Sequence, residues 1–208
     1  MSKALIVVDV QNDFIDGSLA VADGEQTAHR IATVLDLDSY DQIVTTQDWH
    51  ISPGYANKAP ASEGIHWSAE PDFVNTWPIH CQAFSHGAEL SPRLDPILDR
   101  IDARFYKGAF SAAYSGFEGF VEVKVDDKDD DRQCLAAWLR EHGVTEVDVV
   151  GIATDYCVKA TALDAVKEGF ATIVLLSYCA AVDASAEGTG AAAIAEMRAA
   201  GVRMGELT

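Results

Sequence analysis

The sequence has few basic residues, no long apolar run and no paired-cysteine motif, and each absence excludes a class of protein. Lys and Arg together number 15 against 33 Asp and Glu, which gives a formal net charge of −18. Nucleic acids and anionic membranes bind basic surfaces, so this charge argues against both as partners. No stretch is long and apolar enough to span a bilayer.

The four cysteines are scattered along the chain, at Cys81, Cys134, Cys157 and Cys179, with no C-x-x-C pair. The N-terminal apolar run is short and carries Asp9, so we interpret it as a first strand and not as a signal peptide. We therefore expect a cytoplasmic protein whose thiols are reduced. The 208 residues favour a single domain with a substantial core, over residues 1–208, and leave open whether the chain is a monomer or a homo-oligomer.

Segments with strand and helix patterns alternate along the chain, with no internal repeat and no linker. Runs rich in Val, Ile and Leu predict strands at 4–8, 42–46, 100–106, 147–152, 172–177 and 202–204. Amphipathic or alanine-rich runs predict helices at 23–37, 89–98, 129–142, 154–166 and 183–200. This alternation predicts an α/β fold, a three-layer α/β/α arrangement around a central, mostly parallel, doubly wound sheet.

Four residues with useful chemistry stand at or just after the ends of predicted strands: Asp9, Asp48, Lys107 and Cys157. Right-handed crossovers bring the carboxyl ends of parallel strands to one edge of the sheet, where ligands bind in open α/β folds. We therefore expect these four side chains to lie together. Taken singly, Asp9 is equally well explained as a loop residue that caps a turn, and Lys107 as a surface lysine.

Cys157 falls in the first turn of the helix that follows the strand 147–152, with Thr154 and Asp155 as candidate caps. There the helix dipole and free backbone N–H groups favour the thiolate over the thiol, and the same N–H groups can bind an oxyanion. The pattern therefore predicts a nucleophile with a lowered pKa. The alternative is a buried cysteine with only a packing role.

Asp48 and His50 are two residues apart on an extended segment, so their side chains share a face. The irregular segment 51–80 that follows holds His66 and His80, and irregular loops of this length in compact domains are typically functional. One carboxylate and three imidazoles suit Zn, Fe(II) or Mn, with positions left for water or substrate. The alternative is a polar loop that merely collects histidines.

Five motifs span most of the chain: ALIVVDVQNDF (4–14), TQDWH (46–50), HWSAEPDFVNTWPIHC (66–81), FYKGAFSAAYSGFEGF (105–120) and GIATDYCVKATALDA (151–165). Together they resemble the isochorismatase-like cysteine hydrolases, and within them the nicotinamidases (pyrazinamidases). The resemblance implies that a small heteroaromatic amide, nicotinamide, is hydrolysed to nicotinate and ammonia through a thioester on cysteine, in NAD salvage. It also implies one divalent metal ion.

The resemblance assigns roles residue by residue. It implies a catalytic triad of Asp9, Lys107 and Cys157, and metal ligands at Asp48, His50, His66 and His80. It implies ring-pocket positions at Phe14, Trp77 and Tyr114, and a cis peptide bond between Ile152 and Ala153 that directs the backbone N–H groups of Ala153 and Cys157 at the oxyanion. His66 fits the family pattern if residues 55–65 carry an insertion, because Ala56 stands near the usual place of the second histidine.

Two other functions stay open at this point. A sister enzyme of the same superfamily would hydrolyse an N-carbamoyl or ureido compound, and such relatives generally lack the metal stretch. A catalytically silent member would bind a small molecule without turning it over, although none of the three triad residues is lost here. Bound metal counts against the first alternative, and ammonia release from nicotinamide counts against both.

Overall fold

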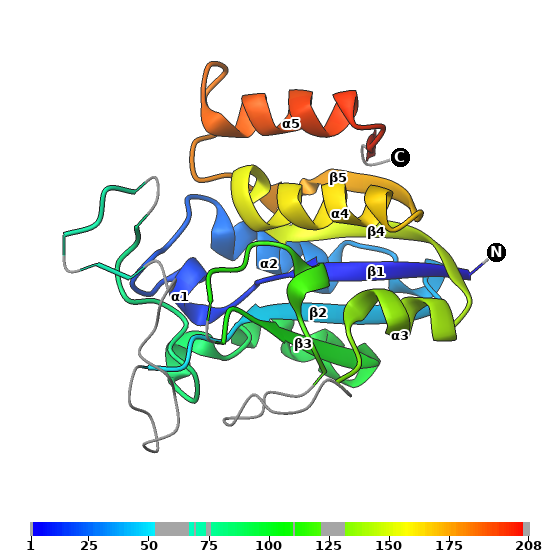
Figure 1. The fold of residues 1–208 in the computed structure, drawn as a ribbon, viewed down its shortest axis with the longest axis horizontal. Coiled ribbons are helices and arrows are strands. Elements are labelled where there is room, and N and C mark those ends of the chain that lie inside the picture. The colour runs from blue at the N-terminus through cyan, green and yellow to red at the C-terminus, as the bar shows by residue number, and fades with distance from the viewer. Residues whose placement is uncertain are drawn as a thin grey trace.

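A parallel sheet forms the centre of the molecule (Figure 1). The computed structural model describes residues 2–52, 67–68, 70–73, 76–109, 111–121 and 132–205. Within these residues the strands are β1 (Ser2–Val8), β2 (Gln42–Asp48), β3 (Ala103–Lys107), β4 (Val144–Ile152), β5 (Ala171–Ala180) and β6 (Arg203–Gly205). Their order is β3-β2-β1-β4-β5-β6, and every neighbouring pair is parallel. The chain winds outward in both directions from β1 and β4, which confirms the doubly wound α/β fold.

Helices cover both faces of the sheet. They are α1 (Asn12–Ile15), α2 (Gly24–Thr33), α3 (Leu135–Glu141), α4 (Lys159–Lys167) and α5 (Thr189–Ala199), with short 3-10 helices at Leu37–Ser39, His86–Ala88, Pro92–Arg100 and Gly116–Glu118. In Figure 1, α3 and α4 lie on one face of the sheet and α2 on the other. None of the helices in the described residues has the length and apolar character that a membrane crossing requires.

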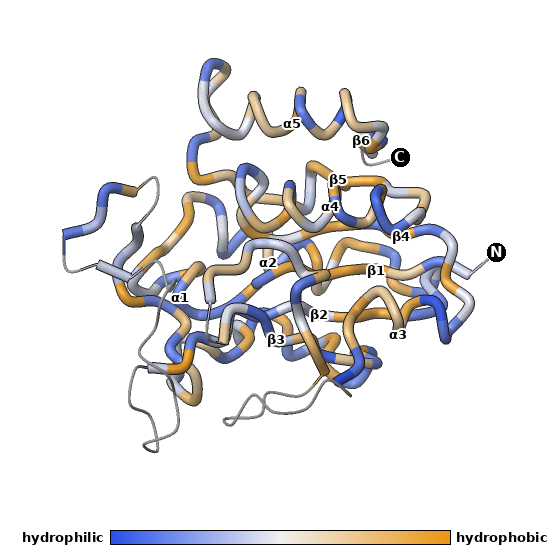
Figure 2. Tube along the Cα trace, viewed as in Figure 1, coloured by the Kyte–Doolittle hydropathy of each residue, from blue (hydrophilic) through white to orange (hydrophobic). Residues whose placement is uncertain are grey.

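The apolar run 4–8 of the central strand β1 stands out in the hydropathy colours of Figure 2. Its five residues are buried, as such a run predicts. Ile6 and Val8 join the core that α3, α4 and α5 cover, whereas Leu5 and Val7 join the core under α2. Successive side chains of a strand point to opposite faces, so one short run serves two cores. This burial fixes the carboxyl end of β1, where Asp9 follows.

Three predicted helix bounds were wrong. The helix expected at 23–37 ends at Thr33, and Val34, which follows it, is 54% exposed. The segment expected at 89–98 is the 3-10 helix Pro92–Arg100, in which Pro96 lacks the N–H that an α-helix would use. The helix expected from 183 begins at Thr189.

Two other segments also depart from expectation. Residues 11–22, for which neither a helix nor a strand was predicted, contain the short helix α1, which places Phe14. The helix expected at 129–142 begins only at Leu135, because the preceding residue Cys134 is extended, and it ends at Glu141; of the expected range, 129–131 lie outside the described residues.

Candidate active site

The four residues predicted at strand ends lie together. Asp9 follows β1, Asp48 ends β2, Lys107 ends β3, and Cys157 lies in the π-helical turn Thr154–Val158 after β4. These four strands are neighbours in the sheet, and Asp48 is paired directly with Lys107 in the register of β2 and β3. The parallel topology therefore brings the four side chains to one edge.

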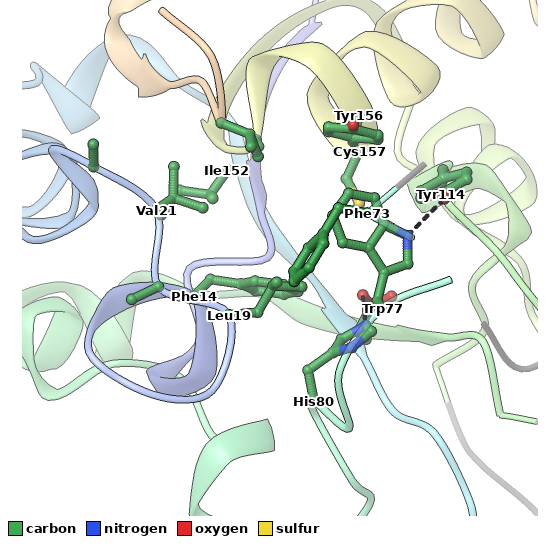
Figure 3. A pocket seen from close by; sticks show the side chains of 15 residues that line it. Phe14, Leu19, Val21, Phe73, Trp77, His80, Tyr114, Ile152, Tyr156 and Cys157 are labelled. Atoms are coloured by element: carbon green, nitrogen blue, oxygen red, sulfur yellow. Dashed lines mark hydrogen bonds and ion pairs between the residues drawn. The ribbon is translucent and has the colours of Figure 1, made fainter. Parts of the chain in front are cut away.

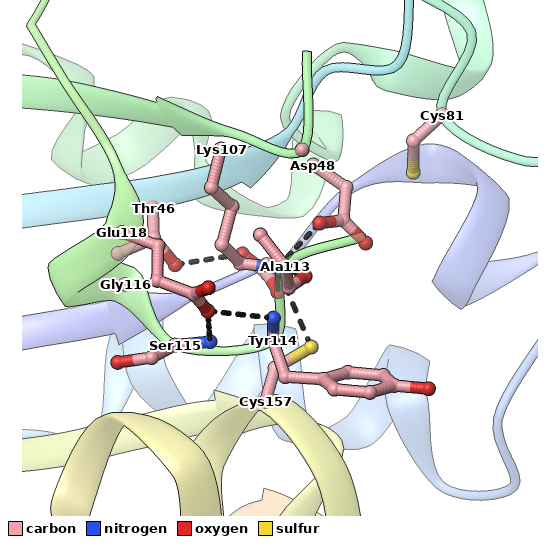
Figure 4. Close-up of polar contacts among 12 residues, drawn as sticks. Thr46, Asp48, Cys81, Lys107, Ala113, Tyr114, Ser115, Gly116, Glu118 and Cys157 are labelled. Carbon is pink, nitrogen blue, oxygen red and sulfur yellow. Dashed lines mark hydrogen bonds and ion pairs between the residues drawn. The ribbon is translucent and has the colours of Figure 1, made fainter. Parts of the chain in front are cut away.

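Lys107 is the centre of this group (Figure 4). Its ammonium Nζ lies 2.9 Å from Asp9 Oδ2, contacts Asp48 Oδ1, and lies 3.5 Å from Cys157 Sγ. The side chains of Lys107 and Asp9 are completely buried. Burial alone would lower the pKa of Lys107, but Asp48 and Asp9 raise it well above its ordinary value. The lysine is therefore a fixed positive charge between two carboxyl groups and a sulfur.

Asp9 is held from its other oxygen as well. The hydroxyl of Thr46, on β2, donates a hydrogen bond of 2.6 Å to Asp9 Oδ1, while Oδ2 faces Lys107. Burial raises the pKa of Asp9 above its ordinary value, although Lys107 acts in the opposite direction. A carboxylate with a raised pKa is a stronger base, which suits a group that takes a proton from a thiol.

The state of Cys157 corrects the prediction of a lowered pKa. Burial raises the pKa of the Cys157 thiol well above its ordinary value, Asp9 and Asp48 add to the effect, and Lys107 offsets it only in part. One oxygen each from Asp9 and Asp48 lies within 4.8 Å of the sulfur and of each other. These carboxylates come from other strands, and together with burial they outweigh the effect of the helix N-terminus on the thiol.

The expected caps of the helix after β4 are also wrong, because the turn uses them differently. The carboxylate of Asp155 accepts hydrogen bonds from the backbone N–H groups of Val182 and Asp183, at 3.0 and 3.1 Å, and from the hydroxyl of Thr189 at 2.6 Å. Asp155 therefore ties the nucleophile turn to the segment between β5 and α5. The peptide bond between Ile152 and Ala153 is cis, and Ala153 lies beside Cys157 in the wall of the same cavity.

Asp48, His50 and His80 form a second group, with one ligand atom from each within 4.8 Å of the others. The Nε2 atoms of His50 and His80 lie 3.7 and 3.8 Å from Asp48 Oδ2. Their Nδ1 atoms lie 2.7 Å from the backbone oxygens of Gly108 and Pro78. Those carbonyls accept the Nδ1 protons, so both Nε2 lone pairs face the carboxylate.

The charge states of this group also suit a metal ion. Burial would raise the pKa of Asp48, but the positive charge of Lys107 holds it below its ordinary value, so the carboxylate is ionised. Burial lowers the pKa of His80 below its ordinary value, so its imidazole is neutral. A carboxylate and neutral imidazoles are the forms that bind a metal ion. His66 lies outside the described residues, so its place as a ligand stays a prediction.

A cavity of about 280 Å³ opens over both groups (Figure 3). Its wall includes Cys157, Asp48 and His80, together with all three predicted ring-pocket residues, Phe14, Trp77 and Tyr114. The indole N–H of Trp77 donates to the Tyr114 hydroxyl at 3.2 Å, which fixes the plane of the indole. The nucleophile candidate and the metal-ligand candidates therefore face one apolar, aromatic space.

Several residues of the site were not predicted from the sequence. Tyr156 packs its ring edge against Trp77 at 5.0 Å, and Phe73, Leu19 and Val182 complete the mouth of the cavity. Thr46 opens the motif TQDWH, which also holds the metal-ligand candidates Asp48 and His50. A hydroxyl so close to them in the sequence could have indicated a place in the site. The mouth residues come from loops with no periodicity, so no pattern marks them.

Comparison with known proteins agrees with this geometry. The isochorismatase domain model matches residues 3–207, so the chain belongs to the isochorismatase family. Within it, the chain is 46% identical to a nicotinamidase/pyrazinamidase of Mycobacterium tuberculosis over 97% of both chains. It is 34% identical to a nicotinamidase of Escherichia coli, over 97% of this chain and 93% of that one.

Solved structures of nicotinamidases and pyrazinamidases have a similar fold. A nicotinamidase of Acinetobacter baumannii superposes with a TM-score of 0.76 at 34% identity, over 99% of this chain and 96% of the other. A pyrazinamidase of Pyrococcus horikoshii in complex with zinc superposes with a TM-score of 0.75 at 29% identity, over the whole of both chains.

Proposed function

We propose that this protein is an amidohydrolase that converts nicotinamide and water to nicotinate and ammonia, and that it also accepts pyrazinamide. The observation that carries this proposal is that one aromatic cavity is lined both by Cys157 and by Asp48 and His80. A flat heteroaromatic amide has the two ends that such a cavity requires, an amide carbon and a ring nitrogen. The curated relatives named above as nicotinamidases support the same substrate.

The pyridine ring would lie against the rings of Phe14 and Trp77, with its amide carbon toward Cys157 and its nitrogen toward Asp48 and His80. Aromatic side chains bury a flat ring well and favour stacked or edge-on contacts with it. Tyr114 would keep Trp77 in place through the hydrogen bond to the indole N–H. Holding the ring in this way positions the amide for attack, which is a large part of the rate gain in such enzymes.

Asp48, His50 and His80, with His66 as the fourth ligand, would hold one divalent ion such as Zn, Fe or Mn. When bound, the ion supplies a Lewis acid that binds the ring nitrogen, directly or through water, and so orients the substrate. Trp67, the residue after His66, places its ring edge against His50 at 5.7 Å, which supports the assignment of His66 to this group. The zinc complex of the structural neighbour supports a metal ion here.

Acylation begins with proton transfer from Cys157 to Asp9. Because the pKa of the thiol is raised by burial, the proton leaves as the sulfur attacks the amide carbon, and no free thiolate accumulates. The carbonyl electrons move to oxygen, and the backbone N–H groups of Ala153 and Cys157 would stabilise that oxyanion. As the carbonyl re-forms, the C–N bond breaks, Asp9 returns its proton to the nitrogen, and ammonia leaves.

Deacylation repeats the same steps with water. Asp9 takes a proton from a water molecule, the hydroxide oxygen adds to the thioester carbon, and the sulfur leaves with that proton to restore the Cys157 thiol. Lys107 stays charged throughout and balances the negative charge that passes between Asp9 and the sulfur. The reaction needs Asp9, Lys107 and Cys157 to be present and in contact, which the silent-binder alternative does not require.

We also propose that residues 1–208 form one domain and that the reaction belongs to pyridine nucleotide salvage in the cytoplasm. A single sheet places Asp9, Asp48, Lys107 and Cys157 at or just after the ends of its strands, and the family model matches nearly the full chain, which supports one domain. Nicotinate is a precursor for NAD synthesis, which supports the salvage role. The four cysteines are free, as expected for a reducing compartment.

The deciding experiment is ammonia release from nicotinamide by the purified protein, before and after chelation, with metal analysis on the same sample. We expect turnover that chelation removes and added metal restores, and no turnover in Cys157→Ala with its metal retained. Bound metal without turnover would contradict nicotinamide as the substrate. Turnover in Cys157→Ala would contradict the thioester route.

A further inference from the structure

The turn that follows His80 has an unusual backbone. Cys81 is fully buried and has a φ of +44°, in the left-handed region that residues other than glycine, asparagine and aspartate seldom occupy. Such a conformation persists only where neighbouring groups impose it. Because Cys81 follows His80 directly, whatever holds this backbone also sets the direction of the His80 side chain.

Two hydrogen bonds hold the main chain of Cys81, one on each side. Its N–H donates to Asp13 Oδ2 at 2.7 Å, and its carbonyl accepts from the backbone N–H of His50 at 3.0 Å. The carbonyl of His50 accepts in turn from the N–H of Ala83 at 2.8 Å. The turn therefore links the two histidines of the metal group, and Asp13 is its side-chain partner.

The surroundings of Asp13 leave room for this carboxylate and for little else. A Cβ at Gly87 would lie 2.1 Å from Asp13 Oδ2, and a Cβ at Gly17 would lie 2.4 Å from Oδ1. Oδ1 also accepts from the N–H of Ser18 at 3.3 Å. Gly17 and Gly87, which are far apart in sequence, both pack against the Asp13 carboxylate without a side chain of their own. This leaves the carboxylate room to reach the backbone N–H of Cys81.

We propose that Asp13 is a positioning residue for the metal group, which it serves by holding Cys81 in the left-handed conformation that directs His80 toward Asp48. The proposal rests on the metal role given to Asp48, His50 and His80 above. Asp13 acts through the backbone of Cys81, and its hydrogen bonds go to the N–H groups of Cys81 and Ser18. Without that acceptor, the backbone of Cys81 relaxes and His80 Nε2 leaves its place 3.8 Å from Asp48 Oδ2.

The test measures zinc affinity without substrate, by titrating the metal-free full-length protein against a competing chelator. We expect Asp13→Ala to raise the zinc dissociation constant about 10–100-fold, as is usual when a partner that orients a metal ligand is lost. Asp13→Asn keeps an oxygen that accepts from Cys81 and should retain most of the affinity. The matched control is Asp16→Ala, an exposed residue at the end of the same helix, which should leave the affinity unchanged.

A second pair of variants separates the backbone effect from general damage. Glycine adopts positive φ without strain, so Asp13→Ala combined with Cys81→Gly should recover much of the affinity that Asp13→Ala loses. Asp13→Ala combined with Cys81→Ala removes the same sulfur but keeps the strain, and should not recover it. Equal recovery in the two double variants, or an unchanged affinity in Asp13→Ala, would overturn the proposal.

The outcome is distinguishable from a failure of the proposed reaction. If the wild type binds zinc but does not hydrolyse nicotinamide, the proposed function fails, and the zinc affinities of the variants still decide the role of Asp13. If the wild type has no affinity for zinc, Fe(II) or Mn, the metal group is refuted and the role of Asp13 with it.

Discussion

Two lysine–aspartate pairs lie in the same sheet in different surroundings. Lys107 lies 2.9 Å from Asp9 at the carboxyl ends of the strands, and Lys3 lies 2.8 Å from Asp148 nearer their amino ends. Both side chains of the first pair are completely buried, whereas the side chain of Lys3 is 29% exposed. Asp148 has a neutral partner as well, the hydroxyl of Tyr40 at 2.7 Å.

The difference shows what each pair contributes. Removing two charges from water costs several kcal/mol per ion, so a fully buried pair is weak evidence for stabilisation. The pair at the carboxyl ends also places its lysine against Asp48 and Cys157, which a purely structural pair does not need. We infer that Lys107 and Asp9 are kept for chemistry, and that Lys3 and Asp148 only join β1 to β4.

Lys107→Met should have the largest effect of the changes that test this contrast. It leaves Asp9 and Asp48 buried without their cation, which typically lowers the free energy of unfolding by about 3–5 kcal/mol. Turnover of nicotinamide should fall by about 10²–10⁴-fold, because Asp9 loses the charge that balances it. Urea unfolding and steady-state kinetics on the same preparation check both. If the variant were as stable as the wild type, Lys107 would not compensate the buried charges of Asp9 and Asp48.

Thr46→Val should come next, because it keeps the shape of the side chain and removes one donor to Asp9. A hydrogen bond to a charged group contributes about 1.5–3 kcal/mol, so the free energy of unfolding should fall by that order. We expect kcat to fall about tenfold with little change in KM, since Thr46 orients the base and does not touch the ring.

Thr46→Ser is the matched control, since it keeps the hydroxyl that donates to Asp9. The methyl of Thr46 packs so closely on Gly116 that a Cβ there would lie 2.5 Å from it, which helps to fix the hydroxyl. Thr46→Ser loses this methyl but keeps the donor to Asp9, so it should recover most of kcat. A loss in Thr46→Ser as large as in Thr46→Val would mean that packing, and not the hydrogen bond, sets the rate.

The sequence was enough to predict where the site residues stand, because strand ends follow from short apolar runs. Asp9, Asp48 and Lys107 each follow such a run, and parallel topology then brings them together whatever the loops do. The same reasoning predicted the sheet and most of its strands. Features that depend on a few consecutive residues, such as a strand and the residue at its end, can therefore be predicted from the sequence.

Properties that depend on contacts across the sheet could not be predicted in this way. The pKa of Cys157 was expected to be lowered by its own helix, but burial and the carboxylates of other strands raise it. Asp155 was expected to cap its own helix, but its carboxylate binds Val182 and Asp183 from another segment. Thr46 and Asp13 act on partners 37 and 68 residues away, and no local pattern records such a distance.

Lys3→Met tests the other side of the contrast. Asp148 keeps the Tyr40 hydroxyl, and Lys3 is already partly in water, so the free energy of unfolding should fall by only about 1 kcal/mol. Neither kcat nor KM for nicotinamide should change, because the pair lies away from the carboxyl ends of the strands. Thermal unfolding and kinetics measure this. A loss of stability equal to that of Lys107→Met would remove the distinction between the two pairs.

Tyr40→Phe should have an effect as small as that of Lys3→Met, and this effect should depend on pH. It removes one hydrogen bond to Asp148, worth about 0.5–1.5 kcal/mol at pH 7.

Burial raises the pKa of Tyr40 above its ordinary value, and Asp148 adds to this shift. Above a pH of about 10 the unfolded chain therefore loses the phenol proton while the folded chain keeps it, which stabilises the unfolded state. The tyrosine's contribution to stability is present below that pH and is lost as the pH rises further, whereas phenylalanine has no proton to lose. Urea unfolding at pH 7 and at pH 10.5 should thus show the gap between wild type and Tyr40→Phe narrowing at the higher pH. A gap that widens would mean that the phenol ionises more readily in the folded protein, contrary to its burial beside Asp148.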